Sequence, residues 1–197
     1  LADDGTTAVT MTYSTTDTGA TYPTPVDDVA CAVRWAAKTA TDNGRPPSRV
    51  IVFGNSAGGH LAALVATSGG HFGGECPYPA TPVDGLIGVA GVYDVSWAGS
   101  YLNGFFGGSQ NEVPDVWAEG DPMWWVESGR AELDGLRVLL VHGDADSTVP
   151  VSVTTTYAKA LTAAGDRPDV EILPGQTHLT VFEADVIGPT IETWLAG

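Results

Sequence analysis

The stretch Val50-Ile51-Val52-Phe53-Gly54-Asn55-Ser56-Ala57-Gly58-Gly59-His60 decides the fold. Its four apolar residues at 50–53 predict a fully buried strand, and the apolar run at 61–66 predicts a helix. Between them stands a Gly-x-Ser-x-Gly pattern, and strand, pattern and helix in this order predict the sharp turn called a nucleophile elbow. A chance pattern in a glycine-rich loop is the alternative, and the flanking strand and helix argue against it.

The residue types of this turn have a physical reason. So sharp a turn forces Ser56 into a strained backbone conformation, and a Cβ at Gly54 or Gly58 is expected to collide with the neighbouring strand or helix. Asn55 completes the elbow on the strand side. The turn would hold the Ser56 hydroxyl above the edge of the sheet, at the positive end of a helix dipole.

Length and charge limit the function. The chain has 197 residues, which fit one domain with a sizeable core, and no apolar run is long enough to cross a membrane. The net charge is −16, from 24 acidic and 8 basic residues. Because such a surface repels phosphate backbones and anionic lipid, we expect no nucleic-acid or membrane partner, and a neutral ester or amide as substrate.

The rest of the chain alternates β-prone and helical segments. Further strands are predicted at 6–13, 85–90, 136–141 and 169–173, and helices at 24–42, 150–164 and 185–196, with a helix end at 1–5. Thr24 is expected to cap the first full helix, with Pro25 at its first position. Strands that alternate with helices predict an α/β fold, in which a mostly parallel sheet is covered by helices on both faces.

The two cysteines, Cys31 and Cys76, suggest a disulfide. Neither lies in a Cys-x-x-Cys pair and the four histidines are scattered, so no metal site is predicted. Each cysteine could be a small buried hydrophobic residue. An acidic, threonine-rich chain with few lysines is typical of an exported protein, however, and favours a bridge and an extracellular location over a cytoplasmic one.

Polar residues follow the ends of three predicted strands. In an open parallel sheet, functional groups gather beyond the carboxyl ends of the strands. Ser56 follows one such end, Asp144 and Asp146 follow another, and His178 follows a third. A serine nucleophile needs a base, and the base needs a carboxylate to orient it. The chain order Ser, Asp, His is a known one for this triad, although the chemistry alone leaves the choice of aspartate open.

Position selects His178 from the four histidines. We expect His60 to be a packed or capping residue, His142 to be structural because it ends a buried strand, and His71 to be exposed in a glycine-rich loop.

Taken together, the motifs resemble the α/β-hydrolase superfamily, in particular its carboxylesterase and feruloyl-esterase-like branch near the hormone-sensitive-lipase group. The matching stretches are GNSAGGH at 54–60, HGDADSTVP at 142–150, PGQTH at 174–178, YPTPVDDVACAVRWA at 22–36 and VYDVS at 92–96. The resemblance implies that Ser56 is the nucleophile, His178 the general base and then acid, and Asp146 the orienting carboxylate, because the family's acid is fifth in His-Gly-x-x-Asp. It also implies that the backbone N–H of Ala57 forms part of an oxyanion hole.

The resemblance predicts a further segment. In the α/β-hydrolase branch that the chain resembles, a His-Gly-Gly loop after the third strand supplies the other donor of the oxyanion hole. This motif does not occur in the sequence. Residues 6–13 align by resemblance with the family's fourth strand. We therefore expect residues 1–197 to be the C-terminal part of one catalytic domain, lacking the N-terminal strands, with the missing segment either separate or absent.

Aromatic residues crowd the segment 93–128, a candidate cap or pocket segment. Tyr93, Trp97, Trp124 and Trp125 are candidate walls of a pocket for an aromatic or apolar ester; ordinary core packing is the alternative for each.

We expect a serine esterase that hydrolyses neutral carboxylic esters through an acyl-enzyme, without cofactor or metal. The alternatives are an amidase or exopeptidase on the same fold, and a non-catalytic binding protein.

Overall fold

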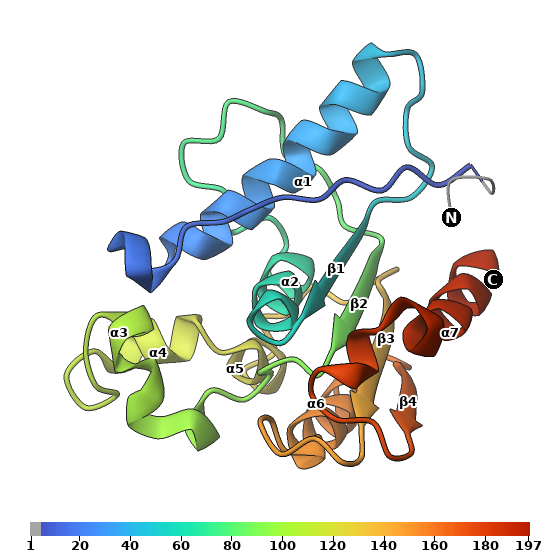
Figure 1. Ribbon diagram of the computed structural model, residues 1–197. Helices are drawn as coiled ribbons and strands as arrows, with labels where there is room; N and C mark the ends of the chain where they lie inside the picture. Colours follow the sequence, from blue (N-terminus) through green and yellow to red (C-terminus); the bar gives the residue numbers. More distant parts are fainter. Residues whose placement is uncertain (1–4) are drawn as a thin grey trace.

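A computed structural model describes residues 5–197 of the chain, so the helix end expected at 1–5 lies outside the described residues except for Gly5. The strand expected at 6–13 is wrong: this segment is extended but forms no β-ladder in the described part of the chain. It runs along helix α1 (Thr24–Asp42) instead (Figure 1). Its β-prone residues Val9 and Met11 are exposed, and the segment is anchored where the Ser14 N–H donates to Asp28.

Four parallel strands form the sheet, in the order in which they occur along the chain. They are β1 (Ile51–Asn55), β2 (Gly85–Val89), β3 (Arg137–Gly143) and β4 (Asp169–Leu173). β1 is one edge of this sheet and β4 the other. The predicted α/β fold with a parallel sheet is thus confirmed.

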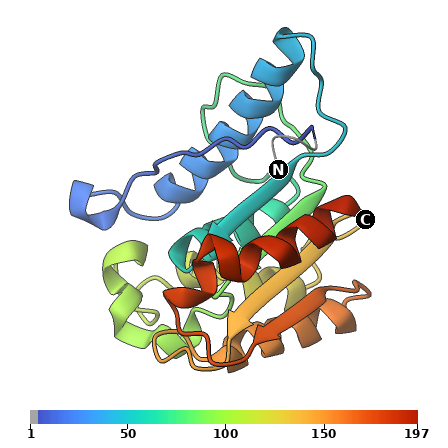
Figure 2. The same ribbon diagram turned by 45° about the vertical axis from the view of Figure 1, so that its right-hand side comes forward.

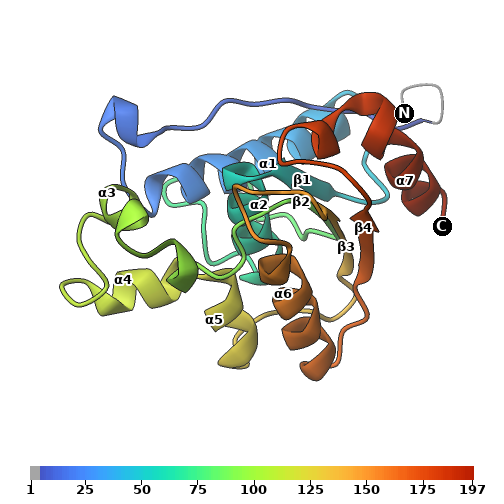
Figure 3. The same ribbon diagram turned by 60° about the horizontal axis from the view of Figure 1, so that its bottom comes forward.

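Helices cover both faces of the sheet (Figures 2 and 3). On one face α2 (Ala57–Thr67) packs against β1 and β2 and is flanked by α1 and α5 (Pro122–Glu127), while α6 (Val151–Ala163) packs against β3 and α5. On the other face lies α7 (Ala184–Ala196). The period of two along the strands explains this division, because alternate residues of each strand enter two separate cores. Leu86, Val138 and Leu140 pack with α2, whereas Ile87, Leu139 and Val141 pack with α7.

Helix α1 begins one residue earlier than expected. Thr24 is its first residue rather than its cap, and the preceding Pro23 makes no side-chain capping bond. Asp27, in the first turn, accepts the N–H of Gly73 at 2.7 Å. The predicted disulfide is confirmed: Cys31 of α1 is bonded to Cys76 in the loop after α2. The loop is thus attached to α1 by both a covalent bond and hydrogen bonds.

The aromatic segment folds into short helical pieces. They are η3 (Ser96–Leu102), α3 (Asn103–Phe106), α4 (Pro114–Glu119) and α5; two further short turns are η2 (Thr16–Thr18) and η4 (Thr180–Phe182). Trp117 and Trp125 are buried, and their indole N–H groups donate to backbone carbonyls.

Within residues 5–197, no helix has both the length and the apolar character of a membrane span.

Candidate active site

Ser56 stands at the turn between β1 and α2, in a conformation that L-residues rarely adopt. Its φ is 53° and its ψ −120°. Gly54 is required there, because a Cβ on it would overlap the backbone carbonyl of Gly58. The same expectation for Gly58 is wrong, since a Cβ on that residue would meet nothing within 4 Å. The second tight position is Gly59, where a Cβ would lie 2.9 Å from the Cα of Gly91.

The first turn of α2 presents backbone donors next to Ser56. Ala57 is the first residue of this helix and is exposed. The first N–H groups of a helix have no partner within it and carry the positive end of its dipole. The N–H of Ser56 is already occupied, because it donates to the carbonyl of Val89 at 2.9 Å. The N–H of Ala57 can therefore stabilise an anion that forms beside the Ser56 hydroxyl.

Two hydrogen bonds connect Ser56, His178 and Asp146. The Ser56 Oγ lies 2.8 Å from His178 Nε2, and His178 Nδ1 lies 2.6 Å from Asp146 Oδ2. Because an ionised carboxylate only accepts, the Nδ1–H of His178 donates to Asp146, which leaves Nε2 free to accept the serine proton. The side chain of His178 is 12% exposed, so a small molecule can reach the site from solvent.

The carboxylate of Asp146 is fully buried and well supplied with donors. Its Oδ1 accepts the backbone N–H groups of Thr148 at 2.8 Å and Val149 at 2.9 Å. Burial alone would raise the pKa of Asp146, but the hydrogen bonds from His178, Val149 and Thr148 outweigh it and lower this pKa. Asp146 is therefore ionised at neutral pH. The other candidate, Asp144, is exposed and accepts the N–H of Gly175 at 2.6 Å.

A close backbone approach brings His178 to this place. A Cβ on Gly143 would overlap the carbonyl of Gln176, which accepts the N–H of Ala145 at 3.0 Å. Only glycine lets the loop after β3 lie so near the loop that carries His178. Sequence reasoning missed this role, although the glycine stands in the His-Gly-x-x-Asp motif.

The other histidines lie as expected. His60 is buried, its Nε2 is 2.7 Å from the carbonyl of Gly120, and burial lowers its pKa to about 4. His142 is buried between Thr154 and Val149. His71 is exposed and contacts Glu119.

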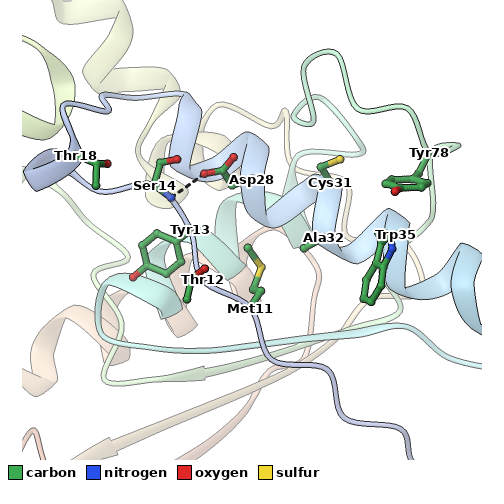
Figure 4. Close-up of a pocket in the computed structure, with 10 residues that line it drawn as sticks. All are labelled: Met11, Thr12, Tyr13, Ser14, Thr18, Asp28, Cys31, Ala32, Trp35 and Tyr78. Carbon is green, nitrogen blue, oxygen red and sulfur yellow. Dashed lines mark hydrogen bonds between the residues drawn. The ribbon is translucent and has the colours of Figure 1, made fainter.

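Of the four aromatic residues expected to line a substrate pocket, two are buried in the core and two are accessible. Tyr93 is completely buried and stacks on Tyr157 at 4.8 Å, and Trp125 is 6% exposed, so neither can wall an open pocket. They fill the core below the segment instead. Trp97 is exposed and Trp124 half-buried. An open pocket of about 660 Å³ lies elsewhere, between the N-terminal segment and α1, and its lining includes no residue of the Ser56–His178–Asp146 chain (Figure 4).

Comparison with known proteins relates the chain to esterases. Esterase LipQ of Mycobacterium tuberculosis is 28% identical over 155 residues, which cover 74% of this chain and 36% of LipQ. Carboxylesterase NlhH of the same species is 28% identical over 187 residues, which cover 87% of this chain and 56% of NlhH. The chain thus spans between about a third and just over half of the length of these curated relatives.

A solved structure shares the fold. A truncated form of a carbohydrate esterase from gut microbiota superposes with a TM-score of 0.77 over 93% of this chain and 71% of that chain, at 22% identity. The family model described as BD-FAE matches residues 1–161, which include the nucleophile elbow and Asp146. The chain therefore belongs to the BD-FAE family, in the carboxylesterase branch of the α/β-hydrolase superfamily.

Proposed function

We propose that the chain is the catalytic part of a serine esterase that hydrolyses neutral carboxylic esters. The observation that carries the proposal is the hydrogen-bonded chain Ser56–His178–Asp146 at the carboxyl end of the sheet. The esterase names of two relatives, LipQ and NlhH, support the same class of reaction.

Acylation starts with attack of Ser56 Oγ on the ester carbonyl carbon. His178 Nε2 takes the serine proton as the C–O bond forms, and the buried negative charge of Asp146 stabilises the resulting imidazolium. The carbonyl oxygen becomes an oxyanion that the N–H of Ala57 stabilises. When the intermediate collapses, His178 returns the proton to the leaving alcohol, and the acyl group stays on Ser56.

Deacylation repeats these steps with water as the nucleophile. His178 Nε2 removes a proton from the water, the hydroxide attacks the acyl carbon, and a second oxyanion forms beside Ala57. Collapse releases the acid and restores the Ser56 hydroxyl. Every proton transfer uses the same nitrogen, so the reaction needs no group other than these residues and the oxyanion donors.

The second oxyanion donor is proposed to come from a His-Gly-Gly loop on a further strand beside β1. β1 is an edge of the described sheet, and its Phe53 is 46% exposed, in contact with the half-exposed Phe182. A strand added at this edge would cover the exposed ring. Loss of one such donor costs about 100- to 1,000-fold in turnover, so a longer protein with this strand should hydrolyse esters at least that much faster than residues 1–197 alone.

The chemistry of the surface points to neutral substrates and to export. A net charge of −16 disfavours anionic esters, and Trp97 and Trp124 are proposed to contact the apolar part of the ester. The disulfide is typical of proteins that fold in an oxidising environment, which supports secretion.

The decisive test is the Ser56→Ala variant with p-nitrophenyl acetate. We expect hydrolysis to fall to the background rate while the circular dichroism spectrum stays unchanged, because only one oxygen atom is removed. A fluorophosphonate probe should label Ser56 of the unchanged protein, which a non-catalytic binding protein would not permit. A matched ester and anilide would separate an esterase from an amidase. Hydrolysis that survives in the variant would exclude Ser56 as the nucleophile.

A further inference from the structure

A second histidine contacts the carboxylate of Asp146. His142 lies near the end of β3 and its side chain is completely buried. Its Nε2 is 3.1 Å from Asp146 Oδ2, the same oxygen that accepts the N–H of His178. Two imidazoles therefore meet at one carboxylate oxygen, and the proposed mechanism uses only one of them.

The surroundings of His142 determine where its proton lies. Nε2 has two acceptors within reach, the carbonyl of Val149 at 3.0 Å and Asp146 Oδ2. A bare nitrogen lone pair facing two acceptors would be repelled by both, so Nε2 carries a hydrogen. Nδ1 lies 2.6 Å from the hydroxyl of Thr154 in α6, which can donate to it. This arrangement satisfies a neutral ring whose Nε2–H is shared between Val149 and Asp146.

Burial keeps His142 neutral. Loss of hydration lowers the pKa of His142, and the Val149 carbonyl and the Asp146 charge offset only part of this effect. Within the described residues, the titratable groups that act on His142 are Asp146 and His178; its partner from α6, Thr154, carries no charge. A neutral donor leaves Asp146 its full negative charge while sharing one of its oxygens.

We propose that His142 is a positioning residue of the esterase, which holds and moderates the Asp146 carboxylate through its neutral Nε2–H. The backbone N–H groups of Thr148 and Val149 hold Oδ1. Oδ2 is contacted by His178 and by His142. Without it, Oδ2 would lose a restraint on its position, and more of its charge would be available to the imidazolium of His178. The inference rests on the proposed function of Ser56, His178 and Asp146.

The test compares two substitutions of His142. In His142→Leu, the leucine side chain is similar in volume to histidine but has no hydrogen-bond donor. We expect kcat to fall about ten-fold with KM unchanged, because His142 is buried away from substrate. We also expect the midpoint of the acidic limb of the kcat/KM profile to move about half a unit to higher pH, because His178 would retain its proton more strongly. His142→Gln places an amide N–H near the position of Nε2, and should restore most of both quantities.

His60 supplies a matched control. It is also a buried neutral histidine bonded to a backbone carbonyl, but it does not contact Asp146. His60→Gln should leave the midpoint of the acidic limb where it is, whatever it does to stability. The proposal is overturned if His142→Leu leaves the midpoint unchanged, if His142→Gln behaves as His142→Leu does, or if His60→Gln shifts the midpoint equally.

A measurement on the unchanged protein does not depend on variants or on turnover. Nitrogen-15 NMR of histidine-labelled protein should show His142 as a neutral ring with hydrogen on Nε2 between pH 5.5 and 8, a range of about one to two units on each side of the reference pKa of histidine. A ring protonated on Nδ1 alone, or an imidazolium at neutral pH, would overturn the proposal. If the protein does not hydrolyse esters, the proposed function fails while this measurement still decides the state of His142.

Discussion

Removal of the Cys31–Cys76 bridge should lower the free energy of unfolding by an amount set by the length of the loop that the bridge closes. The two cysteines are 45 residues apart. In the chain-entropy account of disulfides, a closed loop of this size corresponds to about 4 kcal/mol of unfolding free energy at 25 °C, near the upper end of measured cases. The double variant Cys31→Ala/Cys76→Ala removes the constraint from the unfolded chain and leaves the sheet untouched.

Equilibrium urea unfolding of both proteins measures the effect. The urea concentration at the unfolding midpoint should fall. In a separate thermal unfolding experiment the melting temperature should drop by about 8–16 °C, since 1 kcal/mol shifts the melting temperature of a domain of this size by about 2–4 °C. The reduced unchanged protein is the control and should match the double variant. Because the bridge joins α1 to the loop after α2 and includes no residue of the Ser56–His178–Asp146 chain, ester hydrolysis well below the melting temperature should be preserved. A loss of stability below about 1 kcal/mol would refute the entropic reasoning.

Three further predictions concern the site and its support. Asp146→Asn should lower kcat about ten-thousand-fold, whereas Asp144→Asn, at an exposed loop position, should cost far less; steady-state kinetics with one ester decides between them. Burial and the charges of nearby acids raise the pKa of Asp121 to about 7, so this carboxyl destabilises the fold as pH rises from about 4 to 7. Asp121→Asn should therefore raise stability by a few kcal/mol at pH 8 and by almost nothing at pH 4, as urea unfolding at both pH values would show. Gly54→Ala should lose both stability and hydrolysis, because its Cβ overlaps backbone, while Gly58→Ala should keep or raise stability by up to about 1 kcal/mol; equal melting temperatures for the two would contradict this.

The parts of the fold that sequence reasoning could predict are those encoded locally. The runs at 50–53, 85–90 and 136–141 are apolar enough to be strands whatever surrounds them, and all three form strands of the sheet. The expectation that the run at 50–53 is fully buried is wrong, because β1 is an edge strand and its Phe53 is 46% exposed. Once the strands are parallel, their carboxyl ends must lie together. This is why Ser56 and His178 could be selected although 122 residues separate them.

The predictions that failed depend on tertiary neighbours. Residues 6–13 have strand propensity, but a strand also needs a partner, and propensity does not supply one. Tyr93 and Trp125 are buried by helices that pack over them, which no local pattern reveals. Likewise, the tight approach at Gly59 rather than at Gly58 is set by Gly91, a residue distant in sequence.

Helix α2 has almost no surface that faces water. Each of its residues from Gly59 to Thr67 is buried, and α1, α5 and the sheet surround it. The serine that precedes this helix is thus attached to an element that the core encloses from Gly59 to Thr67, so the helix cannot tilt without disturbing the packing around it. Amide protons of α2 should exchange only through global unfolding, and heat inactivation should coincide with the melting of the domain.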